Sequence, residues 1–295
     1  MSSKIPKLDR HSVKSLLKNT LLNTIENIAT HLSDFLENHE PESLHQYRVN
    51  VRMARSVCLE FSEFMEEKRK FNLEKILKTL QKETNDMRDL DVFLECIEAY
   101  KSMVNPSCLN EFQDLEMKLR MEKEEAYNTF EAKFTQAFKE DLIAQLQAIQ
   151  SDNKLCLPKS EEKIYKYVKE ILLARLKKIA KASQKLSLDS PNAHFHKLRL
   201  HYKKLRYNTD AIKLNQFSKS FKPIQTAFGR VQDKNSQIER IKRYNTQNST
   251  CLEQIAALLE QELIADKQAC IEKSSKENIA KMQNTIQKTF THKAK

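Results

Sequence analysis

Two short blocks of basic residues carry the chemistry that this sequence offers. In the first block, His45, Arg48, Arg52 and Arg55 recur at a helical spacing. On a helix that advances about 100° per residue, these four side chains fall within an arc of about 80°. Arginine can bind two phosphate oxygens at once because its guanidinium group is a planar fork of donors. Such a row, about 15 Å long, predicts a site for a linear chain of phosphates.

The second block repeats the first at an offset of 151 residues. It consists of His196, Arg199, Lys203 and Arg206, and it is flanked by Lys204. Because no acidic residue lies one turn away on the same face, the cations repel one another and cost stability unless an anion neutralises them. The histidine at the head of each block can donate a hydrogen bond to phosphate and become charged when an anion binds.

A further pair of matching segments follows the two blocks. Residues 87–91 contain Arg88 and Asp89, and residues 231–235 contain Asp233 at the position that corresponds to Asp89. We expect these residues to support the blocks, with each carboxylate accepting a hydrogen bond from histidine or arginine and fixing its rotamer. The repeats predict two copies of one four-helix unit, over residues 1–150 and 151–295.

The composition predicts an all-α protein. The chain has 295 residues, no Trp and a single glycine, Gly229. This excludes glycine-rich phosphate loops and dinucleotide-binding fingerprints and disfavours sheets with tight hairpins. The linker between the units is expected at residues 151–154, with Pro158 soon after. Helices are expected over residues 10–38, 42–66, 70–103, 107–150, 160–187, 192–216, 219–245 and 247–291.

Each basic block lies on a helix whose other face is apolar, so that face is expected to pack inside a bundle. The apolar positions are Leu44, Tyr47, Val51, Ala54, Cys58 and Phe61 in the first helix, and Leu198, Tyr202, Leu205 and Ile212 in the second.

The positive charge is concentrated in one part of the chain. The formal net charge is +11, and residues 191–245 hold 13 Lys and Arg against three Asp and Glu. A surplus so concentrated favours a polyanion as partner.

Cysteine usage and hydropathy predict a cytoplasmic protein with no membrane segment. The six cysteines are scattered and contain no C-x-x-C pair, so we expect reduced, mostly buried thiols rather than a disulfide framework. The first residues lack the apolar stretch of a secretory signal, and the longest apolar run is about five residues, whereas a membrane span needs about 20.

Two metal sites can be imagined from the sequence, and neither is expected to form. Asp89 and Asp91 lie about 200° apart on a helix and cannot share one ion. His194, His196 and His201 are close in sequence but point in widely different directions on a helix, which disfavours zinc. No cofactor is expected.

The two blocks and the segments after them resemble the signature of CHAD domains, the conserved histidine α-helical domains. The resemblance rests on His45-x-x-Arg48-x-x-x-Arg52-x-x-Arg55, on His196-x-x-Arg199-x-x-x-Lys203-Lys204-Leu205-Arg206-Tyr207, on Arg88-Asp89-Leu90-Asp91-Val92 and on Phe228-Gly229-Arg230-Val231-Gln232-Asp233. It covers about residues 10–245.

This resemblance implies two four-helix bundles of long antiparallel helices, related by a pseudo-twofold axis. It further implies that the basic helices line a central groove or pore that binds inorganic polyphosphate, and that some members are recruited to polyphosphate granules. Two departures weaken the first copy: Met53 replaces a residue that is often basic, and Asn85 stands where a glycine is usual.

Three functions therefore stay open. Non-enzymatic binding of polyphosphate is favoured. Binding of RNA or DNA fits the charge, but few aromatic residues are interleaved with the cations to stack on bases. A phosphohydrolase or phosphotransferase is the third, although neither a nucleophile nor a metal cage can be identified. The sequence does not determine the oligomeric state.

Overall fold

The computed structural model describes residues 8–9, 11–82, 84–151, 159–246 and 249–290. Over these residues the chain forms α-helices and short 3-10 helices, and no strand. The elements are α1 (Val13–Asn38), α2 (Pro41–Glu60), η1 (Ser62–Phe64), α3 (Glu67–Lys82), α4 (Asn85–Lys101), η2 (Pro106–Cys108), α5 (Leu109–Lys133), α6 (Gln136–Ser151), α7 (Glu161–Ser183), α8 (Asn192–Ala211), α9 (Asn215–Ser220), α10 (Lys222–Tyr244), α11 (Thr250–Lys273) and α12 (Lys276–Thr289). The expected all-α fold is confirmed.

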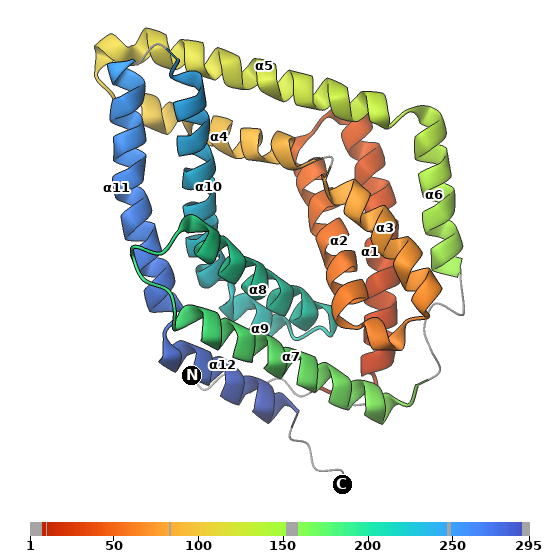
Figure 1. Ribbon diagram of the computed structural model, residues 1–295. Coiled ribbons are helices and arrows are strands. Elements are labelled where there is room, and N and C mark those ends of the chain that lie inside the picture. The colour runs from red at the N-terminus through yellow and green to blue at the C-terminus, as the bar shows by residue number, and fades with distance from the viewer. Residues whose placement is uncertain (1–7, 10, 83, 152–158, 247–248, 291–295) are drawn as a thin grey trace.

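The long helices are arranged as the four sides of a quadrilateral (Figure 1). Each side has an inner and an outer helix: α2 inside α1, α4 inside α5, α8 inside α7, and α10 inside α11. The helices that carry the basic blocks, α2 and α8, are therefore both inner helices, and they pack against each other. No helix in the described part of the chain is long and apolar enough to cross a membrane.

The apolar faces predicted from the sequence are buried. In α1, buried Val13, Leu17 and Leu21 begin a stripe that continues at a spacing of three or four residues. Helix α2 begins at Pro41, which suits the first turn of a helix because proline has no N–H to satisfy there. All the apolar residues predicted to pack inside from the two basic helices are buried, from Leu44 to Phe61 and from Leu198 to Ile212. This burial fixes which face of α2 and α8 remains for the cations.

Six of the eight expected helices are interrupted. Residues 42–66 divide at Phe61, residues 70–103 at Thr84, residues 107–150 at Phe134, residues 192–216 after Ala211, residues 219–245 at Phe221, and residues 247–291 at Ser274 and Ser275. These breaks contain no glycine or proline. Lys213 has a left-handed φ of 56°, and the hydroxyl of Ser275 accepts from the backbone N–H of Asn278 to begin α12.

The break at residue 134 is fixed by burial. Phe134 is buried and stacks on Phe130 with ring centroids 4.2 Å apart, while its backbone N–H donates to carbonyl groups of the last turn of α5. The stack joins residues one turn apart and is local, whereas the burial of Phe134 depends on tertiary packing that a local pattern of polar and apolar residues does not reveal.

The division into units of residues 1–150 and 151–295 stays a prediction. Ser151 is the last residue of α6, and the rest of the expected linker, Asp152 to Lys154 with Pro158, lies outside the described residues. Helices from the two proposed units pack together where α2 meets α8, where α1 meets α7, and where α4 meets α10.

The expectation of reduced cysteines is wrong for one pair. Cys108, at the end of η2, and Cys251, in the first turn of α11, form a disulfide with their Cα atoms 5.5 Å apart. They are separated by 143 residues in the sequence, so only the tertiary fold brings them together. Cys58, Cys96 and Cys270 are free thiols, and Cys156 lies outside the described residues. The disulfide removes the cysteine-based argument for a cytoplasmic location.

The disulfide should stabilise the fold because it restricts the unfolded chain over a long loop. From the conformational entropy that a cross-link removes from the unfolded chain, a loop of this length gives a stabilisation of at most about 5 kcal/mol. We predict that dithiothreitol lowers the Tm measured by circular dichroism, whereas the double variant Cys108→Ser/Cys251→Ser shows a lowered Tm that dithiothreitol does not change. An equal response of the variant and the wild type to the reductant would contradict this assignment.

Candidate functional site

The two basic blocks face each other across the contact between α2 and α8. The pKa values of Arg199 and Lys203 on α8 are both influenced by Arg52 on α2, and that of Lys203 also by Arg48. Charges act on one another in this way only at short range in a salt solution. The structure thus brings cations from both blocks into one cluster, although they are about 150 residues apart in the sequence. We call Arg48, Arg52, Arg199 and Lys203 the central cations.

Arg48 is held by neutral oxygen atoms at the start of α4. Its side chain is buried, with 4% of its surface exposed. Its Nη1 donates to the Thr84 hydroxyl at 2.6 Å, and its Nη2 donates to Oδ1 of Asn85 at 3.1 Å. Burial, followed by the charge of Arg52, lowers the pKa of Arg48 to about 10, so the group is still charged at neutral pH.

Arg55 and Arg206 occupy matching places at the ends of the two blocks. Nη1 of Arg55 donates to Oε1 of Gln81 at 2.6 Å, and Nη1 of Arg206 donates to Oε1 of Gln225 at 2.7 Å. Gln81 and Gln225 are 144 residues apart, the same interval that separates Asp89 from Asp233. The two hydrogen bonds therefore follow the register of the sequence repeat. Arg206 also pairs with Asp210, one turn further along α8, at 3.3 Å, so the expectation that no acidic residue lies one turn from these cations is wrong for Arg206.

The two histidines at the heads of the blocks have different surroundings. His196 is exposed, and its Nδ1 shares a hydrogen bond with Oε1 of Gln232 at 2.5 Å. The corresponding neighbour of His45 is Arg88, a cation. Burial, followed by the charge of Arg88, lowers the pKa of His45. Arg88 also pairs with Glu95 at 3.1 Å.

Three of the central cations, Arg52, Arg199 and Lys203, lack a hydrogen-bonded or ionic partner within the described residues. Nε of Arg199 is also buried without a partner. Burial lowers the pKa of Arg199, with Asp233 opposing and Arg52 adding to the effect. The pKa of Lys203 lies well below its usual value because of burial and the charges of Arg199 and Arg52.

Asp89 and Asp233 act on these cations through charge. The expected hydrogen bonds from histidine or arginine to these two carboxylates do not appear among the described contacts, in which Arg48, Arg55, Arg206 and His196 instead meet side-chain amides or the Thr84 hydroxyl. Asp89 is exposed and Asp233 is half-buried. Burial raises the pKa of Asp233, with Arg199 opposing and Asp89 adding to the effect. Two carboxylates thus lie among the cations without neutralising any of them directly.

Lys204 belongs to a different cluster, although the sequence groups it with the second block. Its Nζ lies 3.6 Å from Oε1 of Glu60. Glu60 also accepts from Nη2 of Arg175, whose Nη1 lies 3.0 Å from Nδ1 of His201. Lys204 therefore already has a partner and takes part in a polar network between α2, α7 and α8. Asn208, on α8, completes it by donating to Glu60 at 3.5 Å.

Neither metal site considered from the sequence is found. No group of three or more His, Cys, Asp or Glu in the described ranges is arranged to hold a metal ion. Asp91 is buried and pairs with Lys123 at 2.7 Å, so it faces α5 rather than the central cations.

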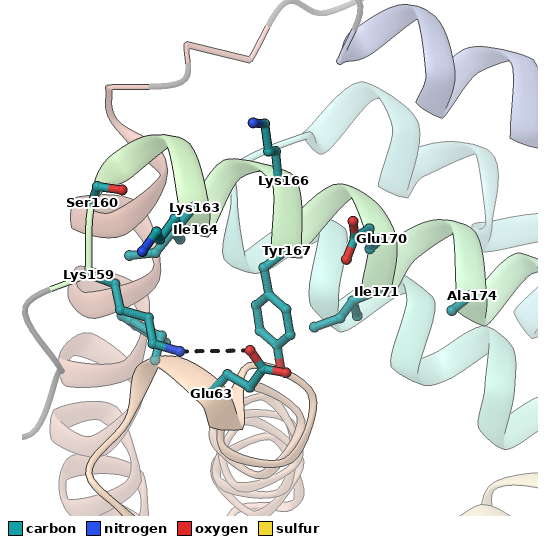
Figure 2. Close-up of a pocket in the computed structure, with 11 residues that line it drawn as sticks. Glu63, Lys159, Ser160, Lys163, Ile164, Lys166, Tyr167, Glu170, Ile171 and Ala174 are labelled. Carbon is teal, nitrogen blue, oxygen red and sulfur yellow. Dashed lines mark ion pairs between the residues drawn. The ribbon is translucent and has the colours of Figure 1, made fainter.

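A separate pocket lies between η1 and the first half of α7 (Figure 2). Its volume is about 870 Å³, and Lys159 pairs with Glu63 across it at 3.7 Å. It shares no residue with the basic blocks. Its lining is mixed, with lysines, glutamates and an apolar wall, namely Glu63, Phe64, Lys159, Ser160, Lys163, Ile164, Lys166, Tyr167, Glu170, Ile171 and Ala174. This mixture does not resemble a site for a polyanion.

Comparison with known proteins agrees with the geometry. The sequence model of the CHAD domain matches residues 20–242, which is most of the chain. This chain belongs to the CHAD domain family.

Solved structures show the same fold at low sequence identity. The CHAD domain from the plant Ricinus communis is 17% identical, with a TM-score of 0.61 over 97% of this chain and 96% of that chain. PptA from Streptomyces chartreusis is 12% identical, with a TM-score of 0.69 over 94% of this chain and 99% of that chain. No curated protein sequence matches this chain.

Sequence reasoning found the cations of this CHAD domain but missed the groups that hold them. Gln81 and Gln225 are ordinary polar residues in the sequence, and only the shared interval of 144 residues could have marked them as a pair. Thr84 and Asn85 were missed as acceptors because the expected helix ran through them. A search for polar residues recurring at the interval between Asp89 and Asp233 would have found the glutamines.

The charge of Lys203 should cost stability in the free protein. Its lowered pKa means that the folded state binds this proton more weakly than the unfolded state, so stability rises with pH between the two pKa values. We predict that Lys203→Met raises the Tm at pH 7 by about 2 to 4 °C, or about 1 kcal/mol. The gain should shrink between pH 7 and pH 10.

The matched control is Lys204→Met, at the next position of α8. This variant should gain no stability, because Lys204 pairs with Glu60. Equal Tm shifts for the two variants, or a gain for Lys203→Met that does not change with pH, would contradict the prediction.

Proposed function

We propose that this CHAD domain binds inorganic polyphosphate between the basic blocks of α2 and α8, and that it does so without catalysing a reaction. The observation that supports this most strongly is the convergence of the central cations, which are positioned by packing and by neutral oxygen atoms instead of by carboxylates. Bringing like charges together costs free energy in the free protein. An anion of high charge density recovers that cost when it binds. The CHAD family is itself one linked to polyphosphate.

A chain of phosphates fits this arrangement better than a single small anion. Each block extends over about 15 Å of helix, and the two blocks come from helices that meet in the fold. One phosphate can pair with one or two guanidinium groups and would leave the others unpaired. A linear polymer places a negative charge near each cation in turn, including Arg55 and Arg206 at the ends of the blocks.

Nucleic acid is the alternative ligand, and the aromatic residues argue against it. Binding of single strands generally uses exposed aromatic rings on which bases stack. The tyrosines within the two blocks, Tyr47 and Tyr202, are fully buried, and Phe195 is buried as well. The faces that carry the cations therefore offer charge without a stacking surface, which favours a polyanion that has no bases.

The neighbours of the cations favour binding over catalysis. The groups in contact with Arg48, Arg55 and Arg206 include the Thr84 hydroxyl and the amides of Asn85, Gln81 and Gln225. Amides hold a cation in place but do not transfer protons at ordinary pH. These neutral contacts position the cations without themselves supplying a base or a nucleophile, which supports our proposal of a binding protein instead of an enzyme.

The double variant Arg199→Gln/Lys203→Gln tests the site directly. It removes two central cations that have no carboxylate partner, so the helical fold should be retained. We predict that it weakens binding of long-chain polyphosphate at least about 100-fold in calorimetry, since each charge-assisted contact contributes about 1.5 to 3 kcal/mol. The affinity of the wild type should also fall steeply with salt through counterion release.

The matched control is Lys178→Gln/Lys197→Gln, which removes the same charge from the exposed outer surface of α7 and α8. The affinity of this control for polyphosphate should stay within about threefold of that of the wild type, because salt screens the interaction of exposed charges with a ligand bound elsewhere. Equal losses of affinity in the two double variants would contradict the site.

Displacement of polyphosphate by equimolar RNA would favour the nucleic-acid alternative. Release of phosphate on incubation with magnesium would contradict the non-enzymatic part of the proposal.

Binding should also depend on pH through His45. Because burial and Arg88 lower the pKa of His45, its charge appears only below the usual histidine value of about 6.5. A bound polyanion favours the charged form, so the affinity should rise as the pH falls below that value. We predict that His45→Gln reduces this rise, whereas Arg88→Gln moves it to higher pH by removing the like charge that lowers the pKa of His45 most. A pH profile that is the same in all three proteins would exclude a role for His45.

A further inference from the structure

A small cavity lies at the corner of the quadrilateral where the end of α1 and the start of α2 meet α4 and α5 (Figure 1). Its volume is about 190 Å³, and it shares no residue with the central cations. A cavity of about 150 Å³ can hold a molecule of the size of benzene, so this one has room for a small organic ligand. Leu44 and Met87 form the apolar part of its wall, and Asp91, Lys123 and Glu124 form the charged part.

Three aromatic rings that touch one another complete the wall of this cavity. The centroid of the Tyr127 ring lies 4.3 Å from that of His39 and 5.9 Å from that of Phe35. Aromatic faces attract cations, because the ring carries partial negative charge on its faces. Burial raises the pKa of Tyr127, and the charges of Glu131 and Glu124 add to the effect, so the potential at this ring is negative. The ring group therefore favours a cation as ligand.

Asp91 contributes a buried carboxylate to the same cavity. Its side chain is 4% exposed, and its Oδ1 lies 2.7 Å from Nζ of Lys123 on α5. Within the described residues, no hydrogen bond or ion pair reaches its other oxygen atom, Oδ2. With Glu124, two carboxylates line this cavity against one ammonium group. A second N–H donor can therefore bind to Asp91 beside Lys123.

The sequence repeat relates Lys123 to a lysine of the second half. Lys123 on α5 and Lys267 on α11 are 144 residues apart, which is the interval of the repeat in this part of the chain. Leu119 and Leu263 are separated by the same interval and are both buried, so the two helices share one register. The surroundings of Lys267 therefore show which contacts this position makes in the other half.

Lys267 places its ammonium group against an aromatic ring and main-chain carbonyl groups. Its Nζ lies 5.3 Å from the centroid of the Phe195 ring and donates to the carbonyl oxygen of Ser190 at 3.2 Å. Phe195 corresponds to Leu44, which lines the cavity of the first half, at the interval of 151 residues that relates α2 to α8. The second half thus holds a primary ammonium group of its own at the place that corresponds to the cavity.

A second difference between the halves explains why Asp91 is available. Asn235, which follows Asp91 by 144 residues, accepts a hydrogen bond from Nδ2 of Asn192 at the start of α8. Asn192 corresponds to Pro41, which has no side-chain donor. The carboxylate of Asp91 therefore lacks the partner that Asn235 has, and it binds an ammonium group instead.

We propose that this cavity is a binding site for a small primary aliphatic amine in its ammonium form. The ammonium group of the ligand donates to Oδ2 of Asp91 and lies against the rings of Phe35 and Tyr127, and its alkyl chain packs on Leu44 and Met87. In the second half, Lys267 supplies the corresponding group from within the chain. The site does not depend on the proposed binding of polyphosphate, because it shares no residue with the central cations.

The test uses protein whose methionine methyl groups carry ¹³C, because Met87 lines the cavity. The ligand is n-butylammonium chloride, which has the chain and the charge of a lysine side chain. We expect it to shift the Met87 signal in NMR spectra and to saturate the shift at roughly millimolar concentration, as suits a ligand of few atoms. The signal of the exposed Met103 should not move. Sodium chloride at the same ionic strength should leave both signals in place, and tetramethylammonium, which has no N–H group, should bind more weakly than n-butylammonium.

Two variants should change the affinity in opposite directions. Asp91→Asn should weaken binding at least about tenfold, because it removes the charge that the ammonium group contacts. Lys123→Met should tighten binding about three- to tenfold, because it removes a like charge and leaves Asp91 to the ligand. The matched control is Asp86→Asn, at an exposed position of the same helix α4, which should bind as the wild type does.

A Met87 signal that does not move, or that moves equally with sodium chloride, would overturn the site. Equal affinity of Asp91→Asn and the wild type would overturn the role of the carboxylate, and equal binding of tetramethylammonium would overturn the assignment to a primary amine. The Lys123→Met variant keeps the test decisive if Asp91→Asn fails to fold, since a gain of affinity cannot come from lost structure. No gain in that variant would contradict the proposal.

Discussion

The main physical constraint on this structure is that the apolar core must hold the central cations close together where α2 meets α8. The apolar faces of the two helices are buried in the core, and this burial supplies the free energy that opposes the repulsion among the central cations. Rotating either helix to separate the cations would expose Tyr47 or Tyr202, both fully buried. The apolar core therefore determines the electrostatics of the site, and the cations cannot relax without loss of packing.

Neutral acceptors are the second component of this arrangement. Gln81 and Gln225 orient Arg55 and Arg206 without reducing the total charge. A carboxylate in the same places would orient the guanidinium group equally well, but a ligand would then have to compete with it. Within the described residues the central cations form no ion pair, whereas Glu60 pairs with Arg175 on the side of α8 that carries Lys204, and Asp210 pairs with Arg206 at the end of the second block. Ion pairs with carboxylates thus lie away from the central cations.

The helical class, the apolar faces and the identity of the cations could be predicted, because helical periodicity and charge are local properties of the sequence. The breaks at Thr84 and Phe134 could not, since both residues are buried by tertiary packing, and Thr84 also accepts a hydrogen bond from Arg48 on another helix. Lys204 was grouped with the second block because it is adjacent to Lys203, whereas neighbouring residues on a helix point about 100° apart and reach different partners. The pairing of Cys108 with Cys251 depends on the meeting of α11 with the start of α5, which no local pattern encodes.

The disulfide also determines which segments of the chain stay covalently linked after the backbone is cut. With Cys108 bonded to Cys251, the segment between them is a closed macrocycle that includes all of α8 and α10, whereas α2 and α4 lie on the arm that precedes it. A single backbone cut inside the macrocycle leaves every fragment attached to the rest. A cut between α2 and α3 separates two fragments that only non-covalent packing retains. The first basic block, on α2, therefore lies in the segment before Cys108 that a backbone cut can release. The second block, on α8, lies within the ring that the disulfide closes.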